Sequence, residues 1–284
     1  MPVSADTLGR PIGTGVDGRV FTPTAQWLQT LEAVRGRERR LSAILPRGGK
    51  RELLVRRLIA GDAKSGMSFR DAPPDTEAFC GDVLSVPGDG RLERDLRERA
   101  RVLMYLRGGA ALPRAPEDLL ALWTSATRAD PSVCGGLPAH FRRDGDRIPF
   151  TGGRSGGEVP RGWETVSPGE IPRETEGLLR WIHTDASPEA RAVCAFFLFG
   201  RIHPFCDGNG RTLRMLTCAL LSGAYSEPVL LSFLERLQSN RPILTEAESR
   251  TNAEREDLSV FGTLLLRVLA LAQNRLVIAS QSGA

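Results

Sequence analysis

The amino-acid sequence predicts an all-α fold with at most a small β-hairpin, on three observations. Apolar residues recur three and four positions apart over several long segments, which is the spacing of one helix face. Glycine and proline gather between these segments, so they separate helices. Helix-start signals also precede some of them, as in Ser187-Pro188-Glu189, where a capping serine is followed by a first-turn proline and an acid.

The first 90 residues are predicted to form an irregular arm and a helical extension. Residues 1 to about 23 hold several glycines and favour an irregular backbone. Thr24–Leu41 and Arg51–Ile59 are expected to be helical. Residues 61–92 are rich in Gly, Asp and Pro, and we expect mostly loop there, with room for one short helix. Nothing in residues 1–90 indicates a role.

Residues 91–276 are predicted to form one helical domain that carries the candidate site. Its expected helices are Leu92–Leu106, Pro116–Thr127, Pro172–Thr184, Ser187–Ile202, Arg211–Leu221, Val229–Gln238 and Leu258–Ala272. The helix Ser187–Ile202 is apolar nearly all round, which is typical of a central, buried helix. Arg147–Gly153 is the candidate for a short extended segment that turns at glycines. Residues 277–284 are expected to form a flexible tail.

Composition narrows the class of protein. A length of 284 residues allows one large domain or two small ones. The formal charge of +4 is small and scattered, so a nucleic-acid partner is disfavoured. We expect no membrane-spanning helix and no secretory signal. The five cysteines form no CxxC pair, which disfavours zinc ribbons and favours a reducing, cytoplasmic location.

One segment concentrates the candidate chemistry: His203-Pro-Phe-Cys-Asp-Gly-Asn-Gly-Arg-Thr-Leu-Arg214. A buried helix ends at its beginning and another helix starts within about eight residues. Gly208 and Gly210 let the backbone turn tightly and let its N–H groups approach a ligand. The N-terminus of the second helix points to the same place, so the segment predicts an anion site suited to phosphate.

The side chains of this segment complete a set for group transfer. His203 has an ordinary pKa near neutrality and suits a general base. Asp207 supplies a carboxylate for Mg²⁺. Arg211 and Arg214 lie three apart on one helix face, and guanidinium groups bind phosphate oxygens in pairs. The combination indicates phosphoryl or nucleotidyl transfer.

Each of these features has an ordinary structural interpretation when it is taken alone. A histidine before proline commonly ends a helix, Asp-Gly-Asn-Gly is a common turn, and helix arginines usually face water. Their joint occurrence at this spacing favours a site. Cys206 leaves open a Cys–His nucleophile pair with His203, although a packing role is favoured. His140 and His183 are expected to be structural or exposed.

The segment resembles the signature of the Fic family (filamentation induced by cAMP), H-x-F-x-[D/E]-G-N-G-R-x-x-R, and matches it at every specified position. A less specific resemblance covers residues 92–240 and includes Gly136 and Phe141-Arg142. It implies an all-helical core with a β-hairpin flap. It also implies a protein adenylyltransferase, which moves AMP from ATP onto a Ser, Thr or Tyr hydroxyl of a target protein.

The resemblance also implies a role for each matching residue. His203 and Asn209 are the expected catalytic residues, one deprotonating the target hydroxyl and the other steadying the α-phosphate. Asp207 is expected to hold Mg²⁺, and Phe205 to anchor the loop in the core. The residues expected to bind ATP are Gly208, Asn209, Gly210, Arg211 and Arg214. The target is expected to pair with a flap near Arg147–Gly153 as an added strand.

The chain departs from the family in two places. The inhibitory pattern [S/T]-x-x-x-E-[G/N], whose Glu pairs with the second motif arginine, is absent from the sequence. We therefore hypothesise that no inhibitory Glu acts in cis and that a separate antitoxin supplies one or the enzyme is unrestrained. Asn240-Arg241 is followed by Pro-Ile-Leu-Thr where relatives often carry a Tyr pair. Transfer of UMP or phosphocholine, removal of AMP, and a non-catalytic nucleotide-binding module therefore stay open as alternatives.

Overall fold

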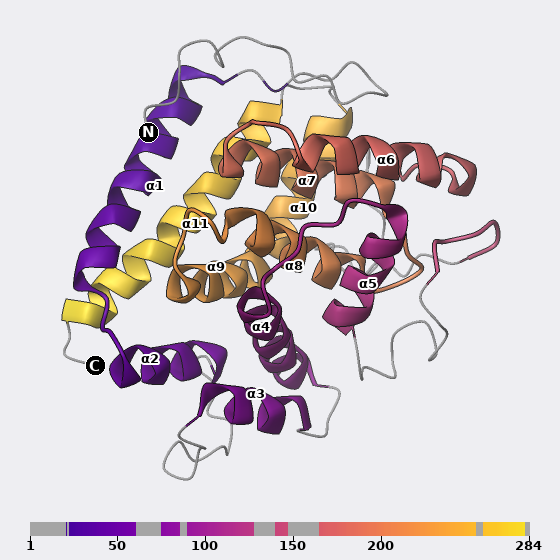
Figure 1. Cartoon of the computed structure of the whole chain (residues 1–284). Helices are drawn as coiled ribbons and strands as arrows, with labels where there is room; N and C mark the ends of the chain where they lie inside the picture. Colours follow the sequence, from indigo (N-terminus) through magenta and orange to yellow (C-terminus); the bar gives the residue numbers. More distant parts are fainter. Residues whose placement is uncertain are drawn as a thin grey trace.

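The computed structural model describes residue 21 and residues 23–60, 75–85, 90–127, 140–146, 165–253 and 258–281. Within these ranges the chain is helical and contains no strand (Figure 1), which confirms the predicted all-α class. The elements are α1 (Ala25–Ile44), α2 (Gly49–Ala60), α3 (Thr76–Ser85), α4 (Arg91–Arg107), α5 (Pro116–Thr127), η3 (Pro168–Glu170), α6 (Ile171–Ile182), α7 (Pro188–Ile202), α8 (Asn209–Leu221), α9 (Glu227–Ser239), α10 (Arg241–Ala253) and α11 (Leu258–Gln281). The predicted hairpin at Arg147–Gly153 lies outside the described residues.

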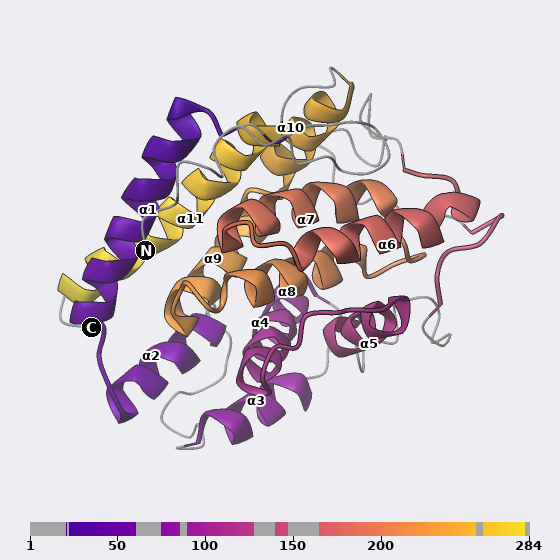
Figure 2. The ribbon, with the colours of Figure 1, turned by 45° about the horizontal axis from the view of Figure 1, so that its top comes forward.

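Helix α7 forms the centre of the fold, as its apolar sequence predicts. It packs against α6, α8 and α11, and Figure 2 shows α6 and α7 running side by side above α8. The side chains of Phe197 and Phe199 are fully buried on this helix. Ser187 caps its first turn by accepting a hydrogen bond from the backbone N–H of Ala190 (3.3 Å), as the start signal predicts.

Two elements differ from the expectations, and one expected possibility is confirmed. The short helix allowed within residues 61–92 is α3. Helix α10 was not predicted, because Leu244 is its one buried hydrophobic residue among those described and so its apolar spacing is weak. Helix α11 continues to Gln281, so the predicted flexible tail of residues 277–284 begins inside a helix. Leu276, packed at 1% exposure, carries the helix past the expected end at Ala272.

Helix α1 lies along α11 (the indigo and yellow ribbons of Figure 1) and shares its core. A Cβ added to Gly262 of α11 would lie 3.0 Å from the Trp27 ring and 2.9 Å from Val193 of α7. Three helices therefore meet at one glycine, with no space for a larger side chain. The division at residue 90 stays a prediction, but α1 packs directly on the helices of the candidate domain.

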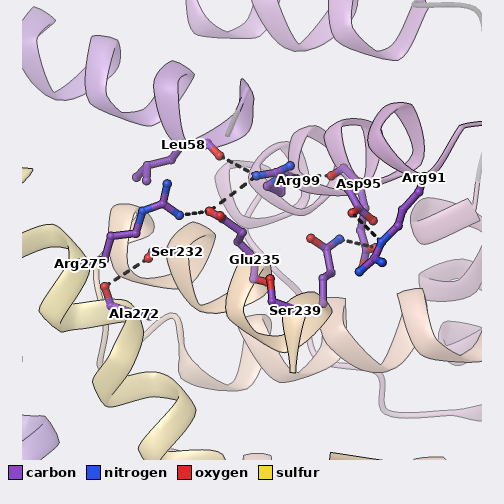
Figure 3. Close-up of polar contacts among 11 residues, drawn as sticks. Leu58, Arg91, Asp95, Arg99, Ser232, Glu235, Ser239, Ala272 and Arg275 are labelled. Atoms are coloured by element: carbon purple, nitrogen blue, oxygen red, sulfur yellow. Dashed lines mark hydrogen bonds and ion pairs between the residues drawn. The ribbon is translucent and has the colours of Figure 1, made fainter. Parts of the chain in front are cut away.

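A buried polar cluster joins the first helices to the rest of the chain. Glu235 of α9 pairs with Arg99 of α4 and with Arg275 of α11, and Figure 3 shows Glu235 between the two guanidinium groups. Arg99 also donates a hydrogen bond to the carbonyl of Leu58 at the end of α2 (3.3 Å). The Glu235 carboxylate thus connects α9 to α4 and α11 directly. It is connected to α2 through Arg99, which also bonds Leu58.

Among the described residues, one helix has the length and hydropathy to cross a membrane. This stretch is Leu258–Ile278 of α11, and 56% of it is buried inside the protein. Gln273 of this stretch is fully buried and donates hydrogen bonds to the carbonyl of Val34 (3.0 Å) and to Glu38 (3.2 Å) of α1. These contacts are those of a core helix.

Candidate functional site

Helix α7 ends at His203, which has a left-handed backbone. Its φ is 46° and its ψ is 58°, and the backbone N–H of His203 closes the last turn on the carbonyl of Phe199 (2.9 Å). A residue that carries a Cβ pays about 1 to 2 kcal/mol for this conformation. Pro204 cannot continue a helix, so the chain leaves α7 here and turns toward α8.

The His203 imidazole is held in its neutral form. Its pKa is lowered from the ordinary 6.5 to about 4, chiefly by burial and further by the charges of Arg142 and Arg241, while a hydrogen bond to the Gly200 backbone opposes the change. A neutral imidazole has a nitrogen lone pair available to accept a proton. The sequence predicts a base of ordinary pKa, and the structure corrects this to a weaker base that is unprotonated at all pH values well above about 4.

The loop after His203 is closed on itself by Asn209. The Asn209 side chain accepts a hydrogen bond from the backbone N–H of Phe205 (3.0 Å) and donates one to the Phe205 carbonyl (2.7 Å). Phe205 is fully buried, and its ring stacks on Phe141 at a centroid distance of 5.7 Å. The anchoring role expected for Phe205 is confirmed. The side chain of Asn209 shapes the loop, and its expected contact with a phosphate stays a prediction.

Helix α5 forms the wall behind the glycine turn. The Trp123 indole donates a hydrogen bond to the carbonyl of Asp207 (2.8 Å). Gly208 has a φ of 79°, and a Cβ there would lie 2.6 Å from a methyl group of Thr127 and 2.8 Å from the Trp123 nitrogen. The backbone conformation and the close wall both require glycine at this position.

Helix α8 begins directly at this turn and presents its N-terminus. Thr212 ties the first turn to the glycine by donating to the Gly208 carbonyl (3.0 Å). The first N–H groups of a helix have no partner within it, and together with the helix dipole they attract anions. The Arg211 guanidinium lies 3.8 Å from the Asp207 carboxylate, so both groups stand beside that terminus.

Arg214 is held by a carboxylate that the sequence did not point to. Its Nε and one terminal nitrogen donate to the two oxygens of Glu98 on α4, at 2.6 and 2.8 Å. Gln238 of α9 donates to the same carboxylate (2.9 Å). Burial opposes the charge on Glu98, but the charge of Arg214 and these bonds hold the pKa of Glu98 below its ordinary value. The remaining nitrogen of Arg214 lies 3.3 Å from where a Cβ of Gly210 would be.

This contact bears on the hypothesis that no inhibitory Glu acts in cis on Arg214. Glu98 does engage it, outside the inhibitory pattern. Glu98 is 4% exposed and is fixed from two helices, so it is part of the packed core. It leaves one edge of the guanidinium turned toward Gly210. The two hydrogen bonds from Arg214 to Glu98 therefore fix the orientation of the Arg214 guanidinium.

Arg241 at the start of α10 connects the parts of the site. It lies within electrostatic range of Arg214, Glu98 and Asp207. Its charge also acts on His203. The charge of Arg241 therefore acts on groups from three parts of the loop, and the predicted convergence of these groups on a single anion stays a prediction.

Cys206 is disulfide-bonded in this structure. Its sulfur is therefore not a free thiol, and the open alternative of a Cys–His nucleophile pair finds no support. The expected cytoplasmic location stays a prediction. His183, expected to be structural, bonds the carbonyl of Pro113 through its Nε2 (2.9 Å).

The donor set fits a magnesium ion that is shared with phosphates. Among the residues that the structure describes, no group of three or more His, Cys, Asp or Glu side chains forms a metal cage. Mg²⁺ is commonly held by one or two carboxylates together with substrate phosphates and water. A single carboxylate, Asp207, beside an anion site has that character.

Sequence reasoning missed Glu98, Trp123 and Gln238 as parts of this site. Glu98 stands in a stretch of alternating charges, and Trp123 lies in the apolar pattern of the helix Pro116–Thr127 like an ordinary core residue. Arg142 was noted only as part of a weak resemblance. No local pattern marks these residues, since each acts through a contact far along the chain.

Comparisons with known proteins find relatives that share part of this sequence or its fold. Residues 152–221 match the model of the Fic/DOC family. Two curated relatives are called Protein adenylyltransferase Fic. The one from Drosophila yakuba is 34% identical over 111 residues, which cover 35% of this chain and 21% of the relative. The one from Drosophila melanogaster is 33% identical over 111 residues, which cover 35% of this chain and 22% of the relative. The match thus spans about a fifth of the length of these relatives.

A solved structure extends the likeness in fold over most of the chain. The crystal structure of a Fic family protein from Desulfovibrio desulfuricans G20 superposes with a TM-score of 0.63 at 17% identity, covering 91% of this chain and 76% of that one. At this identity the likeness concerns the fold alone. Residues 152–221, which include the intact loop of residues 203–214, therefore match the Fic/DOC family, and most of the chain shares the fold of a solved Fic family protein.

Proposed function

We propose that this protein is an adenylyltransferase that moves AMP from ATP to a Ser, Thr or Tyr hydroxyl of a target protein. The observation that carries the proposal is the geometry of the loop at residues 203–214, where the Asp207 carboxylate lies 3.8 Å from the Arg211 guanidinium and Glu98 fixes Arg214. Asp207 and Arg211 lie beside a helix N-terminus that suits phosphate. The relatives that share this domain bear the name protein adenylyltransferase.

In the proposed reaction His203 removes the proton from the target hydroxyl. The hydroxyl oxygen forms a bond to the α-phosphorus of ATP, the bond from that phosphorus to the bridging oxygen breaks, and pyrophosphate leaves with the electron pair. The proton stays on the imidazole until solvent removes it. Because the pKa of His203 is lowered to about 4, the base is in its neutral form at neutral pH.

The remaining motif residues bind and orient the triphosphate. The N–H groups of residues 208–210 would bind the charge that develops on the α-phosphate, that of Gly208 after it leaves the Asp207 carboxylate to which it donates here (2.5 Å). Arg211 takes the β-phosphate, and the free edge of Arg214 takes the γ-phosphate. Asp207 would hold Mg²⁺, which would neutralise negative charge on the triphosphate when bound. Trp123 and Asn209 keep the loop in this shape through the backbone of Asp207 and Phe205.

The partners belong to the same proposal. The target would lie along the segment near Arg147–Gly153 as an added strand, and an antitoxin would supply the inhibitory Glu that the chain lacks. No membrane or nucleic-acid partner is proposed, and the proposed location is cytoplasmic.

Intact-protein mass spectrometry after incubation with ATP and Mg²⁺ tests the proposal. We expect an AMP-sized mass on the protein or on a target in lysate. His203→Ala should abolish the addition, and His183→Ala, a histidine outside the site, should not. Labelling from UTP or CDP-choline in place of ATP would show transfer of another group. ATP binding without transfer would show a nucleotide-binding module and contradict the proposal.

A further inference from the structure

An arginine outside the motif holds the end of α7 from which His203 projects. The Nε of Arg142 donates a hydrogen bond to the carbonyl of His203 itself (3.0 Å). One of its terminal nitrogens donates to the carbonyl of Ile202 (3.4 Å) and to that of Val166. The Arg142 residue is only 7% exposed. A buried cation is thus bonded to three backbone oxygens.

The backbone around Arg142 is fastened to the same turn. The N–H of Arg142 donates to the carbonyl of Pro204 (2.7 Å), and the N–H of Val166 donates to the carbonyl of Arg201 (3.2 Å). Residues 140–146 and residues 165–166 therefore reach the turn from two separate parts of the chain. The carbonyls of residues 201 to 204 all accept hydrogen bonds from these two segments.

These contacts stabilise the end of α7, which carries His203, in two ways. The last carbonyls of a helix have no partner within it, and the end of a helix is the negative pole of its dipole, so a cation there is favourable. His203 also has a left-handed backbone, which fixes the direction of its Cα–Cβ bond only while the turn is held. A displacement of a reacting group by about 1 Å lowers a rate by about 100-fold.

We propose that Arg142 is a positioning residue for His203, fixing the left-handed turn that directs the imidazole into the anion site. This inference rests on the proposed role of His203 as base. Lysine keeps the charge but lacks the planar fork that bridges several carbonyls, so it should replace arginine only in part.

The test compares Arg142→Gln and Arg142→Lys with Arg143→Gln, the matched change at the exposed neighbouring arginine. The chain has three histidines, so ¹³C–¹H spectra of histidine-labelled protein resolve each imidazole, and His203→Ala assigns the signal of interest. The rate constant kcat for AMP transfer and the dissociation constant for ATP are measured on the same samples.

We expect Arg142→Gln to shift the His203 resonance, to leave that of His183 in place, and to lower kcat by about 10- to 100-fold with an unchanged ATP dissociation constant. Arg142→Lys should lie between this variant and the wild type, and Arg143→Gln should match the wild type. A folded Arg142→Gln protein with the wild-type His203 resonance and kcat would overturn the inference. If the Gln variant does not fold, the Lys variant carries the same comparison. If the wild type transfers no AMP, the proposed function fails, while the His203 resonance still decides the role of Arg142.

Discussion

His203 shows how a single residue takes its chemical character from its surroundings. Burial excludes the water that would stabilise an imidazolium ion, and the charges of Arg142 and Arg241 lower the pKa of the ring further. Only the neutral ring accepts a proton. Activity that depends on this base is therefore present above the pKa and is lost as the pH falls through it.

The acid limb of the pH profile follows from this. We expect kcat/KM for AMP transfer to stay level as the pH falls from neutrality and to be lost with a midpoint at about 4. A titration of the His203 ¹³C–¹H resonance should give the same midpoint. A midpoint near the ordinary value of 6.5 would contradict the burial of the ring.

Glu98 is the second residue whose role depends on its partner. Glu98→Gln removes the countercharge of Arg214, whose side chain is only 14% exposed. Leaving one member of a buried ion pair alone costs about 3 to 5 kcal/mol of unfolding free energy. We expect urea denaturation to show that loss and AMP transfer to fall.

The matched change Glu117→Gln, at an exposed glutamate of α5, should alter neither quantity. A several-fold rise in AMP transfer by Glu98→Gln would show instead that Glu98 restrains the enzyme. Our hypothesis that inhibition in cis is absent would then be wrong.

At the scale of elements, the site is the place where one helix ends and another begins. His203 caps the C-terminal end of α7, and α8 contributes its first N–H groups. Helix α5 closes the back of the turn. The turn packs against α5 only because Gly208, which approaches that helix most closely, has no side chain.

Gly208→Ala tests this fit. The new methyl group would meet Thr127 and Trp123 at less than 3 Å, and the backbone has a φ of 79°. We expect a loss of about 2 to 4 kcal/mol of unfolding free energy from the left-handed backbone and the overpacking together, with loss of AMP transfer. Gly223→Ala is the control, since a methyl group there has open space. Wild-type activity in Gly208→Ala would show that the turn does not need its present shape.

At the scale of the whole molecule, the first helix is part of the core that positions the site. Trp27 of α1 is 2% exposed and reaches α11 beside Val193 of α7. Arg35 of α1 pairs with Glu189 in the first turn of α7 (2.7 Å). Both contacts act on the helix that ends at His203.

Trp27→Ala should therefore weaken the whole fold. We expect a loss of about 3 to 5 kcal/mol of unfolding free energy, with far-ultraviolet circular dichroism and tryptophan fluorescence reporting one shared transition. Ile44→Ala, at a half-exposed position late in α1, should change stability by no more than about 0.5 kcal/mol. An early transition confined to α1, with the remaining helices still folded, would show that residues 1–90 form a separate unit.

The sequence by itself determined the helical class, nearly all of the helices and the place of the motif loop at residues 203–214. Helix spacing and turn glycines are local features, and a motif of twelve residues lies within one turn and its two flanks. The sequence did not predict α10 or the end of α11, because their limits are set by packing and not by their own apolar pattern.

Only the tertiary structure shows which residues hold the loop of residues 203–214 and how burial changes the pKa of its groups. Arg142, Trp123 and Glu98 stand 61, 84 and 116 positions from the residues that they contact. Sequence spacing carries no sign of such pairs, since the chain between them folds back through several helices. The lowered pKa of His203 and the paired state of Arg214 come from burial and from neighbours that only the folded chain brings together.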